Sequence, residues 1–467
     1  MNGECKKMLP RCSFPMLCIA AMLITTQDGR SADHTDAAAA ERGYRFLTEN
    51  ALIPPDFNQT TFEEVWQAWP EPLRSQAAKL SPAERRKMSY ERYGLTLRAD
   101  DNSGKPLQYV VTPDGGWTMN CFACHGGTVY GTPVAGAPNN RFALQTLTEE
   151  TFAIKMRQGT PPSRMDLGAI AIPLGTTNGT TNAVVFGMGL MDQRDEQLNW
   201  ILVAPKSFTN HDMDAPPWWY FYKRPSMYID GFAEKGHRGL MQFTLIPENG
   251  PDFYRRYEEN FRDVLSYITS LRAPKYTDVV DHSLAENGKQ LFNANCSECH
   301  GTYESDWSYP NRRVPIDEIG TDPVRLTALT VAGRKKYANS WFAHAGEHDA
   351  QETLIDPVGY VAPPLDGVWA SAPYLHNGSV PTLWHLLHPE QRPQVWRPVS
   401  SQLDTEKVGL TIEEVREVPD GDAELDAVVR RSYFDTQRFG KSNVGHNFPN
   451  RLSEAEKSAV LEYLKTL

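Results

Sequence analysis

The pentapeptide Cys-x-x-Cys-His occurs twice in this sequence, at residues 121–125 and 296–300. Two thiols three positions apart can each bond to one vinyl group of a haem, and the adjacent imidazole then lies under the iron as an axial ligand. Because the chain has 7 Cys and 12 His among 467 residues, chance alone would produce only roughly 0.003 copies of this pattern. The sequence therefore predicts two covalently bound c-type haems. The predicted haem-binding residues are Cys121, Cys124 and His125 for the first haem and Cys296, Cys299 and His300 for the second.

Two other chemistries also use paired cysteines. A structural zinc site would need both pairs to converge on one tetrahedral metal, and it would not explain the histidine after each second cysteine. A thioredoxin-type pair would need a βαβ setting, which the sequence around the motifs does not show. The remaining cysteines are Cys5, Cys12 and Cys18, so no thiol is left elsewhere for a disulfide. The haem interpretation is therefore favoured over both alternatives.

The N-terminal segment has the layout of a secretory signal peptide. Lys6, Lys7 and Arg11 precede an apolar run over residues 14–24, and polar residues follow. The run is too short to cross a bilayer comfortably, so an uncleaved anchor is the weaker alternative. We predict a signal peptide over residues 1–30. Because haem is attached to such motifs outside the cytoplasm, we expect a periplasmic or secreted protein.

Charge narrows the class of partner. The formal net charge is -11 and the pI is about 5.6, so the sequence offers no basic surface for nucleic acid. We expect instead a small redox protein or a membrane electron-transfer complex as the electron partner.

Helical patterns lie on both sides of the second motif. Residues 285–292 form a helical pattern directly before it, and Gly288 within this pattern would allow another helix to approach closely. A closing helix begins near the end of the chain, with Ser453 as N-cap and Glu456 three residues on. A helix before the haem motif and a closing helix that packs across it form the outline of a small cytochrome c domain.

The first motif has a fainter version of the same outline. Residues 264–271 resemble residues 460–467, which end the closing helix, and residues 42–47 resemble the helix before the second motif. The predicted fold is therefore mainly α, with two cytochrome c-like haem domains in tandem and irregular, loop-rich insertions. The predicted boundaries are 31–275 for the N-terminal haem domain and 281–467 for the C-terminal cytochrome c domain.

Two further segments lie between the motifs. Residues 128–182 are rich in Gly, Pro, Thr and Asn and predict loops and short strands over the haem edge. Residues 216–222 form the densest aromatic cluster of the chain. This cluster could pack in the core, or it could flank a haem or a substrate channel.

Residues 362–383, Ala-Pro-Pro-Leu-Asp-Gly through Pro-Thr-Leu, closely resemble the block that follows the second haem in bacterial di-haem cytochromes. This block occurs in the superfamily of di-haem cytochrome c peroxidases, and here it is most similar to the rubber oxygenase-like branch. Residues 442–446 resemble the Asn-Ala-Gly-His segment of that branch. The resemblance covers residues 281–467, and in the first half little beyond the haem motif.

The resemblance implies that His446 is the sixth ligand of the second haem, which would make that haem bis-histidine, low-spin and suited to electron transfer. His376 is the rival within the resembling block, where we expect it to serve packing or outer-shell hydrogen bonding. The superfamily often holds a Ca²⁺ ion between its domains, so calcium is a further expected cofactor.

The sixth ligand of the first haem stays open in the sequence. The candidates are His211, Met213, His237 and Met241, or no residue at all. In the resembling enzymes, the haem that meets oxygen or peroxide keeps this position open or opens it on reduction.

The sequence thus predicts a periplasmic di-haem c-type cytochrome that binds haem and transfers electrons. One hypothesis adds an oxidoreductase activity of the peroxidase or dioxygenase type at the first haem, with peroxide or oxygen as the reactant and the catalytic residues unknown. The alternative is a purely electron-carrying cytochrome docked to a dehydrogenase, with both haems six-coordinate. The long irregular segments around the first motif favour the enzyme.

Overall fold

The computed structural model of the chain describes residues 36–98, 104–203, 211–343, 352–419 and 425–467. The predicted signal peptide over residues 1–30, with the three spare cysteines, lies outside the described residues. Within the described part, no helix has the length and apolar character needed to cross a membrane.

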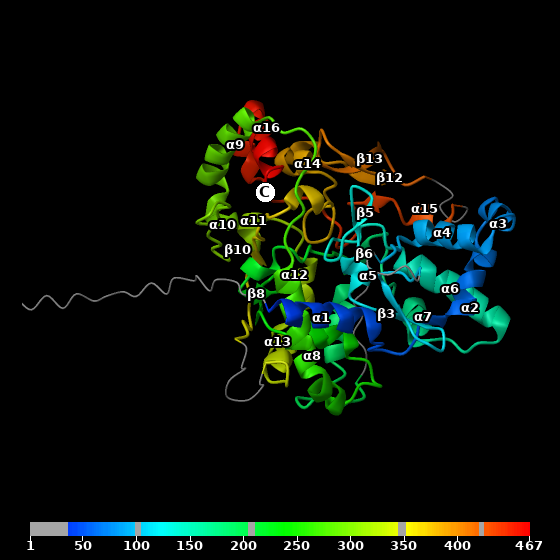
Figure 1. The fold of residues 1–467 in the computed structure, drawn as a ribbon. Coiled ribbons are helices and arrows are strands. Elements are labelled where there is room, and N and C mark those ends of the chain that lie inside the picture. The colour runs from blue at the N-terminus through cyan, green and yellow to red at the C-terminus, as the bar shows by residue number, and fades with distance from the viewer. Residues whose placement is uncertain (1–35, 99–103, 204–210, 344–351, 420–424) are drawn as a thin grey trace, which may run out of the picture. The chain divides into compact units, whose positions relative to one another are not determined.

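The first helix pair lies beside the first motif. Helix α1 (Ala37–Glu49) packs along α8 (Pro251–Ser270), and the two lie side by side in Figure 1. At the crossing, a Cβ on Gly43 would collide with the backbone of Asp263. Glycine is therefore the residue that permits this approach.

A second helix pair repeats this arrangement at the second motif. Helix α9 (His282–Asn295) packs along α16 (Glu454–Leu464), and a Cβ on Gly288 would collide with the backbone of Ala459. The predicted close approach at Gly288 is confirmed. The predicted start of the closing helix is also confirmed, since Ser453 and Glu456 form a capping box there.

The expectation of a mainly α fold with tandem cytochrome domains is wrong. Helices account for 42% and strands for 13% of the structure, and the described residues contain two three-stranded and four two-stranded sheets. The fold is mixed α/β. Short strands were expected over residues 128–182 and occur there, but the same segment also contains helices α6 (Leu144–Gln158) and α7 (Arg164–Ala171), which were not expected. Outside that segment the prediction followed the helices around the two motifs and missed the antiparallel strands that pair between them.

The two larger sheets show how the strands arise. Strands β1 (Phe57–Asn58), β3 (Gly116–Met119) and β2 (Tyr109–Val111) form one sheet, in which β3 is central. The other sheet has the order β13-β12-β14. Its long hairpin is rich in β-branched residues, which favour strands. The bounds are β12 (Val395–Asp404), β13 (Gly409–Val415) and β14 (Phe434–Asp435).

Shorter elements connect these parts. The remaining helices are α2 (Gln59–Glu64), α3 (Leu73–Ala77), α4 (Pro82–Tyr93), α5 (Phe122–His125), α6 (Leu144–Gln158), α7 (Arg164–Ala171), α10 (Ser297–His300), α11 (Ile316–Ile319), α12 (Val324–Ala328), α13 (Val331–Ala338), α14 (Leu383–Leu387) and α15 (Ala427–Arg430). The remaining strands are β4 (Thr128–Val129), β5 (Thr132–Pro133), β6 (Thr180–Thr181), β7 (Met213–Asp214), β8 (Ser226–Met227), β9 (Ala233–Glu234), β10 (Arg313–Pro315) and β11 (Gly359–Val361).

Each motif lies against its own part of the hydrophobic core. Phe122 of the first motif packs with side chains of α1 and α8 such as Phe46 and Phe261. The core around the second motif joins Phe292 of α9 with Trp219, which precedes the predicted domain boundary. The division into 31–275 and 281–467 stays a prediction.

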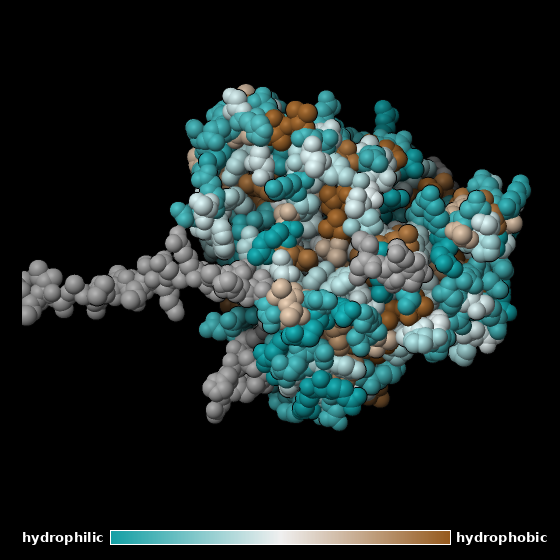
Figure 2. All heavy atoms as spheres, viewed as in Figure 1, coloured by the Kyte–Doolittle hydropathy of each residue, from teal (hydrophilic) through white to brown (hydrophobic). Residues whose placement is uncertain are grey.

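The outer faces of these elements are polar. Helix α8 buries one apolar stripe and exposes charged side chains on the opposite side. Figure 2 shows mainly hydrophilic residues over the region in which Figure 1 places α8 and α13.

Candidate haem sites

The first motif presents a neutral, oriented imidazole. Helix α5 is only one turn long, and His125 at its end donates from Nδ1 to the carbonyl oxygen of Pro216 over 3.0 Å. A carbonyl can only accept, so the proton lies on Nδ1 and the lone pair on Nε2. Burial lowers the pKa of His125 to about 4. The side chain is therefore neutral near pH 7, which is the form that binds metals.

An aromatic ring covers the same histidine. The ring of Trp218 stacks on His125, with ring centroids 4.7 Å apart and an angle of 26° between the planes. Trp218 also contacts Phe122 of the motif, with centroids 5.4 Å apart. Trp218 thus lies beside the first motif, as one interpretation of the aromatic cluster expected. Trp218 is also part of the hydrophobic core and only 8% exposed, as the other interpretation expected.

The second motif repeats the hydrogen bond of the first. His300, at the end of α10, donates from Nδ1 to the carbonyl oxygen of Pro363 over 2.8 Å. Burial lowers the pKa of His300 as well. Tyr303 donates its hydroxyl to the carbonyl oxygen of His300 and accepts from the backbone N–H of Leu365, each over 2.7 Å. The block at residues 362–383 therefore holds the histidine of the second motif in place.

His446 lies opposite His300. Their ring centroids are 6.2 Å apart. An imidazole nitrogen lies about 2 Å from a bound transition metal and about 1.1 Å from the centre of its own ring, so two imidazoles on opposite sides of one metal have centres about 6.2 Å apart. The spacing of His300 and His446 matches that of two axial ligands of one iron.

The loop that carries His446 is pressed against a neighbouring turn. His446 has a positive φ of 51° and donates its backbone N–H to the carbonyl oxygen of Ile319 over 2.7 Å. A Cβ on Gly445 would collide with the backbone of Gly320. Burial, and next the proximity of His300, lower the pKa of His446 to about 3. This loop thus holds a neutral imidazole in a backbone conformation that is uncommon for a non-glycine residue.

His376 has a different environment. Its ring packs on Tyr360 with centroids 4.6 Å apart, and its carbonyl oxygen accepts from the backbone N–H of Asp214 over 3.0 Å. Burial lowers its pKa to about 3. These contacts agree with the packing role expected for His376.

The four candidates for the sixth position at the first site make other contacts. His237 lies 3.2 Å from a carboxylate oxygen of Glu258, and Met241 is fully buried in the core. Arg325 donates to the sulfur of Met213 over 3.2 Å. His211 lies edge-on to Phe439, with centroids 6.4 Å apart. Within the described residues, the ring that contacts His125 on its face is that of Trp218.

The thiols do not resemble a redox-active pair. A reactive cysteine has a lowered pKa, whereas burial raises the pKa of Cys121 to about 12 and that of Cys296 to about 11. Burial also raises the pKa of Cys124 and of Cys299. All four are free of disulfides. The four thiols therefore lack the lowered pKa that is typical of thiol exchange.

A converging metal cluster is also missing from the part of the chain that the structure describes. No group of three or more His, Cys, Asp or Glu side chains there could hold a metal ion. The zinc alternative, which requires both cysteine pairs to meet, is thus not supported, and the expected Ca²⁺ ion has no assigned ligands.

The residues present fit a haem at both motifs. His125, His300 and His446 owe their lowered pKa mainly to burial, and each of the three residues is only partly covered. With the free thiol pairs and the opposed imidazoles at the second motif, this arrangement suits a flat, apolar macrocycle with a metal at its centre.

Sequence reasoning missed several residues of these sites. The carbonyl groups of Pro216 and Pro363 could not be predicted, because every residue type has a backbone carbonyl that can accept a hydrogen bond. It also missed Asp214, whose pKa burial raises well above its ordinary value and whose charge contributes to the raised pKa of Cys124. Thr181, with its hydroxyl 3.8 Å from the sulfur of Cys124, was likewise not foreseen.

Comparison with protein families matches residues 359–397 to the family described as RoxA-like, cytochrome c-like. This region is cytochrome c-like. It contains Pro363, which orients the histidine of the second motif, and it implies a covalently bound haem. The chain is thus related to haem cytochromes, while membership of the di-haem peroxidase superfamily stays a prediction.

Two curated proteins are similar to parts of this chain. Uncharacterized protein y4iM of Sinorhizobium fredii (strain NBRC 101917 / NGR234) is 36% identical over 172 residues, which cover 32% of this chain and 38% of that protein. Uncharacterized protein y4iJ of the same strain is 30% identical over 265 residues, which cover 43% of this chain and 42% of that protein. The matches therefore span less than half the length of either relative.

Proposed function

We propose that this protein is a periplasmic or secreted di-haem c-type cytochrome that transfers electrons between its two haem sites. The observation that carries the proposal is the matching geometry at the two motifs, where each histidine gives its Nδ1 proton to a proline carbonyl and leaves Nε2 for a metal. Haem supplies the one-electron chemistry when it is bound.

The chain's own residues set the properties of each site. Pro216 and Pro363 hold the protons on Nδ1, which fixes the orientation of each ring and makes Nε2 a stronger donor. At the second site, His446 provides the opposed imidazole at 6.2 Å. His300 and His446 would together hold a haem at this site, and the haem would supply electron transfer there.

A short stretch of chain links the two sites. Pro216 accepts from His125, and three residues later Trp219 donates its indole N–H to the carbonyl oxygen of Asp366 over 2.7 Å. Asp366 lies three residues after Pro363, which accepts from His300. The path therefore joins the two motif histidines through hydrogen bonds and a few peptide units. This connection supports electron transfer between the sites.

The second candidate function is an oxidoreductase activity at the first site, with oxygen or peroxide as the reactant. It is favoured by the asymmetry of the sites, because no second imidazole among the described residues contacts His125, whereas His446 faces His300. The electron partner in this proposal is a small redox protein or a membrane electron-transfer complex. A pure carrier would require a sixth ligand at both sites.

Spectroscopy of the purified protein tests both proposals. The pyridine haemochrome assay should give two c-type haems per chain, and electron paramagnetic resonance should show one low-spin bis-histidine signal. A second signal that changes on addition of cyanide or peroxide would support the oxidoreductase. Two low-spin signals that do not change when cyanide or peroxide is added would support a purely electron-carrying cytochrome. A purified protein without haem would contradict the whole proposal.

A further inference from the structure

A cavity of about 410 Å³ lies away from the paired histidines of the second motif. Its walls are largely apolar and include the rings of Trp69, Trp396 and Phe434. All three side chains are at most 2% exposed. Trp396 and Phe434 stack with centroids 5.2 Å apart and nearly parallel planes. These rings are therefore packed behind the surface of the cavity, whereas Leu73, Leu410 and Val428 are partly exposed and present its apolar surface. The volume lies within the range of small-molecule sites in proteins.

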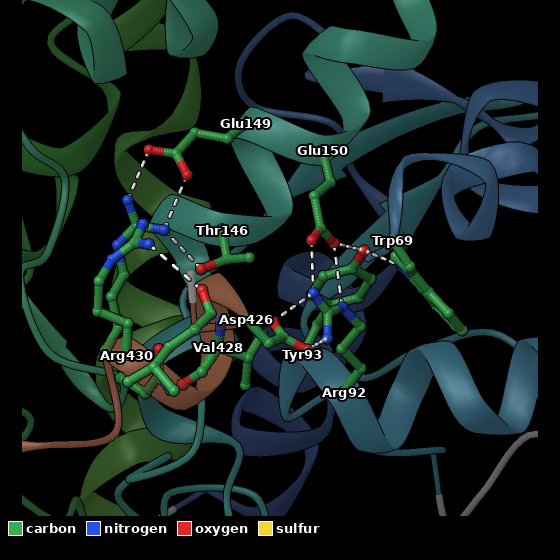
Figure 3. A network of polar contacts seen from close by, with 12 residues as sticks. Trp69, Arg92, Tyr93, Thr146, Glu149, Glu150, Asp426, Val428 and Arg430 are labelled. Atoms are coloured by element: carbon green, nitrogen blue, oxygen red, sulfur yellow. Dashed lines mark hydrogen bonds and ion pairs between the residues drawn. The ribbon is translucent and has the colours of Figure 1, made fainter. Parts of the chain in front are cut away.

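One wall of the cavity is held firmly by ion pairs. Val428 and Val429 of α15 line it, and the adjacent Asp426 bonds to Arg92 over 2.6 Å. Arg92 is bonded in turn to Glu150 of α6. Figure 3 shows Asp426 and Glu150 reaching Arg92 from different elements. Because this wall is already ordered, a ligand would lose little free energy in arranging it.

One charged side chain of the cavity wall has no ion-pair partner among the described residues. The charged side chains that line the cavity are Glu91, Arg92, Arg141 and Asp426. Arg92 bonds to both Asp426 and Glu150, and Glu91 lies 4.0 Å from Lys87. Arg141 is exposed and, among the residues that the structure describes, has no carboxylate within ion-pair distance. Arg141 also lines a smaller neighbouring cavity and therefore lies between the two cavities.

We infer that this cavity binds a small carboxylate with an apolar body, with Arg141 paired to the carboxylate and the side chains of Leu73, Leu410 and Val428 against the apolar body. The planar guanidinium matches a carboxylate in shape and can donate two parallel hydrogen bonds to it. A neutral ligand of the same shape would use the apolar walls alone. The site therefore discriminates by charge at Arg141 and by shape in the interior.

The cavity shares its wall with the first motif. Thr180 lines it, and the next residue, Thr181, contacts the sulfur of Cys124. Asn140 also lines it, and the preceding Asn139 donates its backbone N–H to the carbonyl oxygen of Cys124 over 2.8 Å. Binding here is nevertheless independent of the proposed redox function, since none of the ligand-facing groups belongs to a motif.

Isothermal titration calorimetry of the purified full-length holoprotein tests the inference, with 2-naphthoate as the anionic probe and 2-naphthol as its neutral counterpart. We expect one 2-naphthoate per chain and weaker binding of 2-naphthol. Arg141→Gln should weaken 2-naphthoate by about tenfold, the scale of a hydrogen-bonded charge pair, and leave 2-naphthol unchanged. Arg45→Gln, at another exposed arginine, should change neither affinity.

A second variant tests the interior. Val429→Trp adds volume to the wall and should abolish binding of both probes, while an unchanged circular dichroism spectrum shows that the chain is folded. The inference is overturned if wild-type protein does not bind 2-naphthoate, or if Arg141→Gln binds it as tightly as wild type. Full binding by folded Val429→Trp would place the ligand elsewhere and would equally overturn it.

Discussion

At both motifs a histidine donates its Nδ1 proton to a proline carbonyl, His125 to Pro216 and His300 to Pro363. The ring contacts of the two histidines differ. His300 faces the imidazole of His446 with ring centres 6.2 Å apart, whereas the indole of Trp218 stacks on the face of His125 with centroids 4.7 Å apart. The comparison teaches that a shared motif sets the orientation of one histidine, and that the rest of the fold decides whether a second imidazole faces it.

The largest effect should come from removing one pair of thiols. Cys121→Ala with Cys124→Ala should lower the haem content from two per chain to one, and Cys296→Ala with Cys299→Ala should do the same at the other site. Each double variant serves as the control for the other, because the remaining spectrum should belong to the intact site. The pyridine haemochrome assay measures the content. Loss of both haems in either variant would show that the sites do not load separately.

Removing the opposed imidazole should change the second site strongly. His446→Ala should convert a low-spin signal into a high-spin signal that responds to cyanide, because the sixth position loses its ligand. His376→Ala is the matched control and should leave the low-spin signal in place. Electron paramagnetic resonance measures both. A low-spin signal that persists in His446→Ala but disappears in His376→Ala would reverse the assignment.

A smaller, local effect is expected at the first site. Trp218→Leu should lower the free energy of unfolding by about 2 kcal/mol, since a buried ring and its stacking contact are lost. It should also alter cyanide binding at the first haem and leave the signal of the second haem unchanged. Trp384→Leu is the matched control, because Trp384 stacks on His388 with centroids 4.2 Å apart. An identical cyanide response in both variants would show that Trp218 has no specific influence on the first site.

The smallest effect concerns acid stability. His376 has a pKa of about 3 in the fold because of burial, against about 6.5 in an unfolded chain. Between these values only the unfolded state binds the proton, so stability decreases as the pH falls below about 6.5. His376→Phe should therefore reduce the loss of unfolding free energy between pH 6 and pH 5 by about 1.2 kcal/mol. Urea unfolding at the two pH values measures it, and an unchanged slope would mean that His376 is protonated in the fold.

Part of the fold was predictable from local patterns. The capped start at Ser453 and the close approach at Gly288 have local signatures, a capping box and a glycine within a helical pattern. The mixed α/β character was not predictable in this way, and the mainly α expectation was wrong. Strands β6 and β7 are only two residues long, and they pair although they lie more than thirty residues apart in the sequence (Thr180 with Asp214). Two residues are too few to show the alternation of apolar and polar residues by which a strand is predicted. Their pairing is decided by contacts distant in sequence.

The sequence by itself determined the prediction of haem attachment at the two motifs, because attachment of a c-type haem needs only two thiols and a histidine at fixed local spacing. Only the tertiary structure decided what meets each histidine. His446 is 146 residues from His300 along the chain, and Pro216 is 91 residues from His125. No local pattern encodes such distances, so packing of the helix pairs and loops determines which carbonyl orients each ring and which site gains a second imidazole.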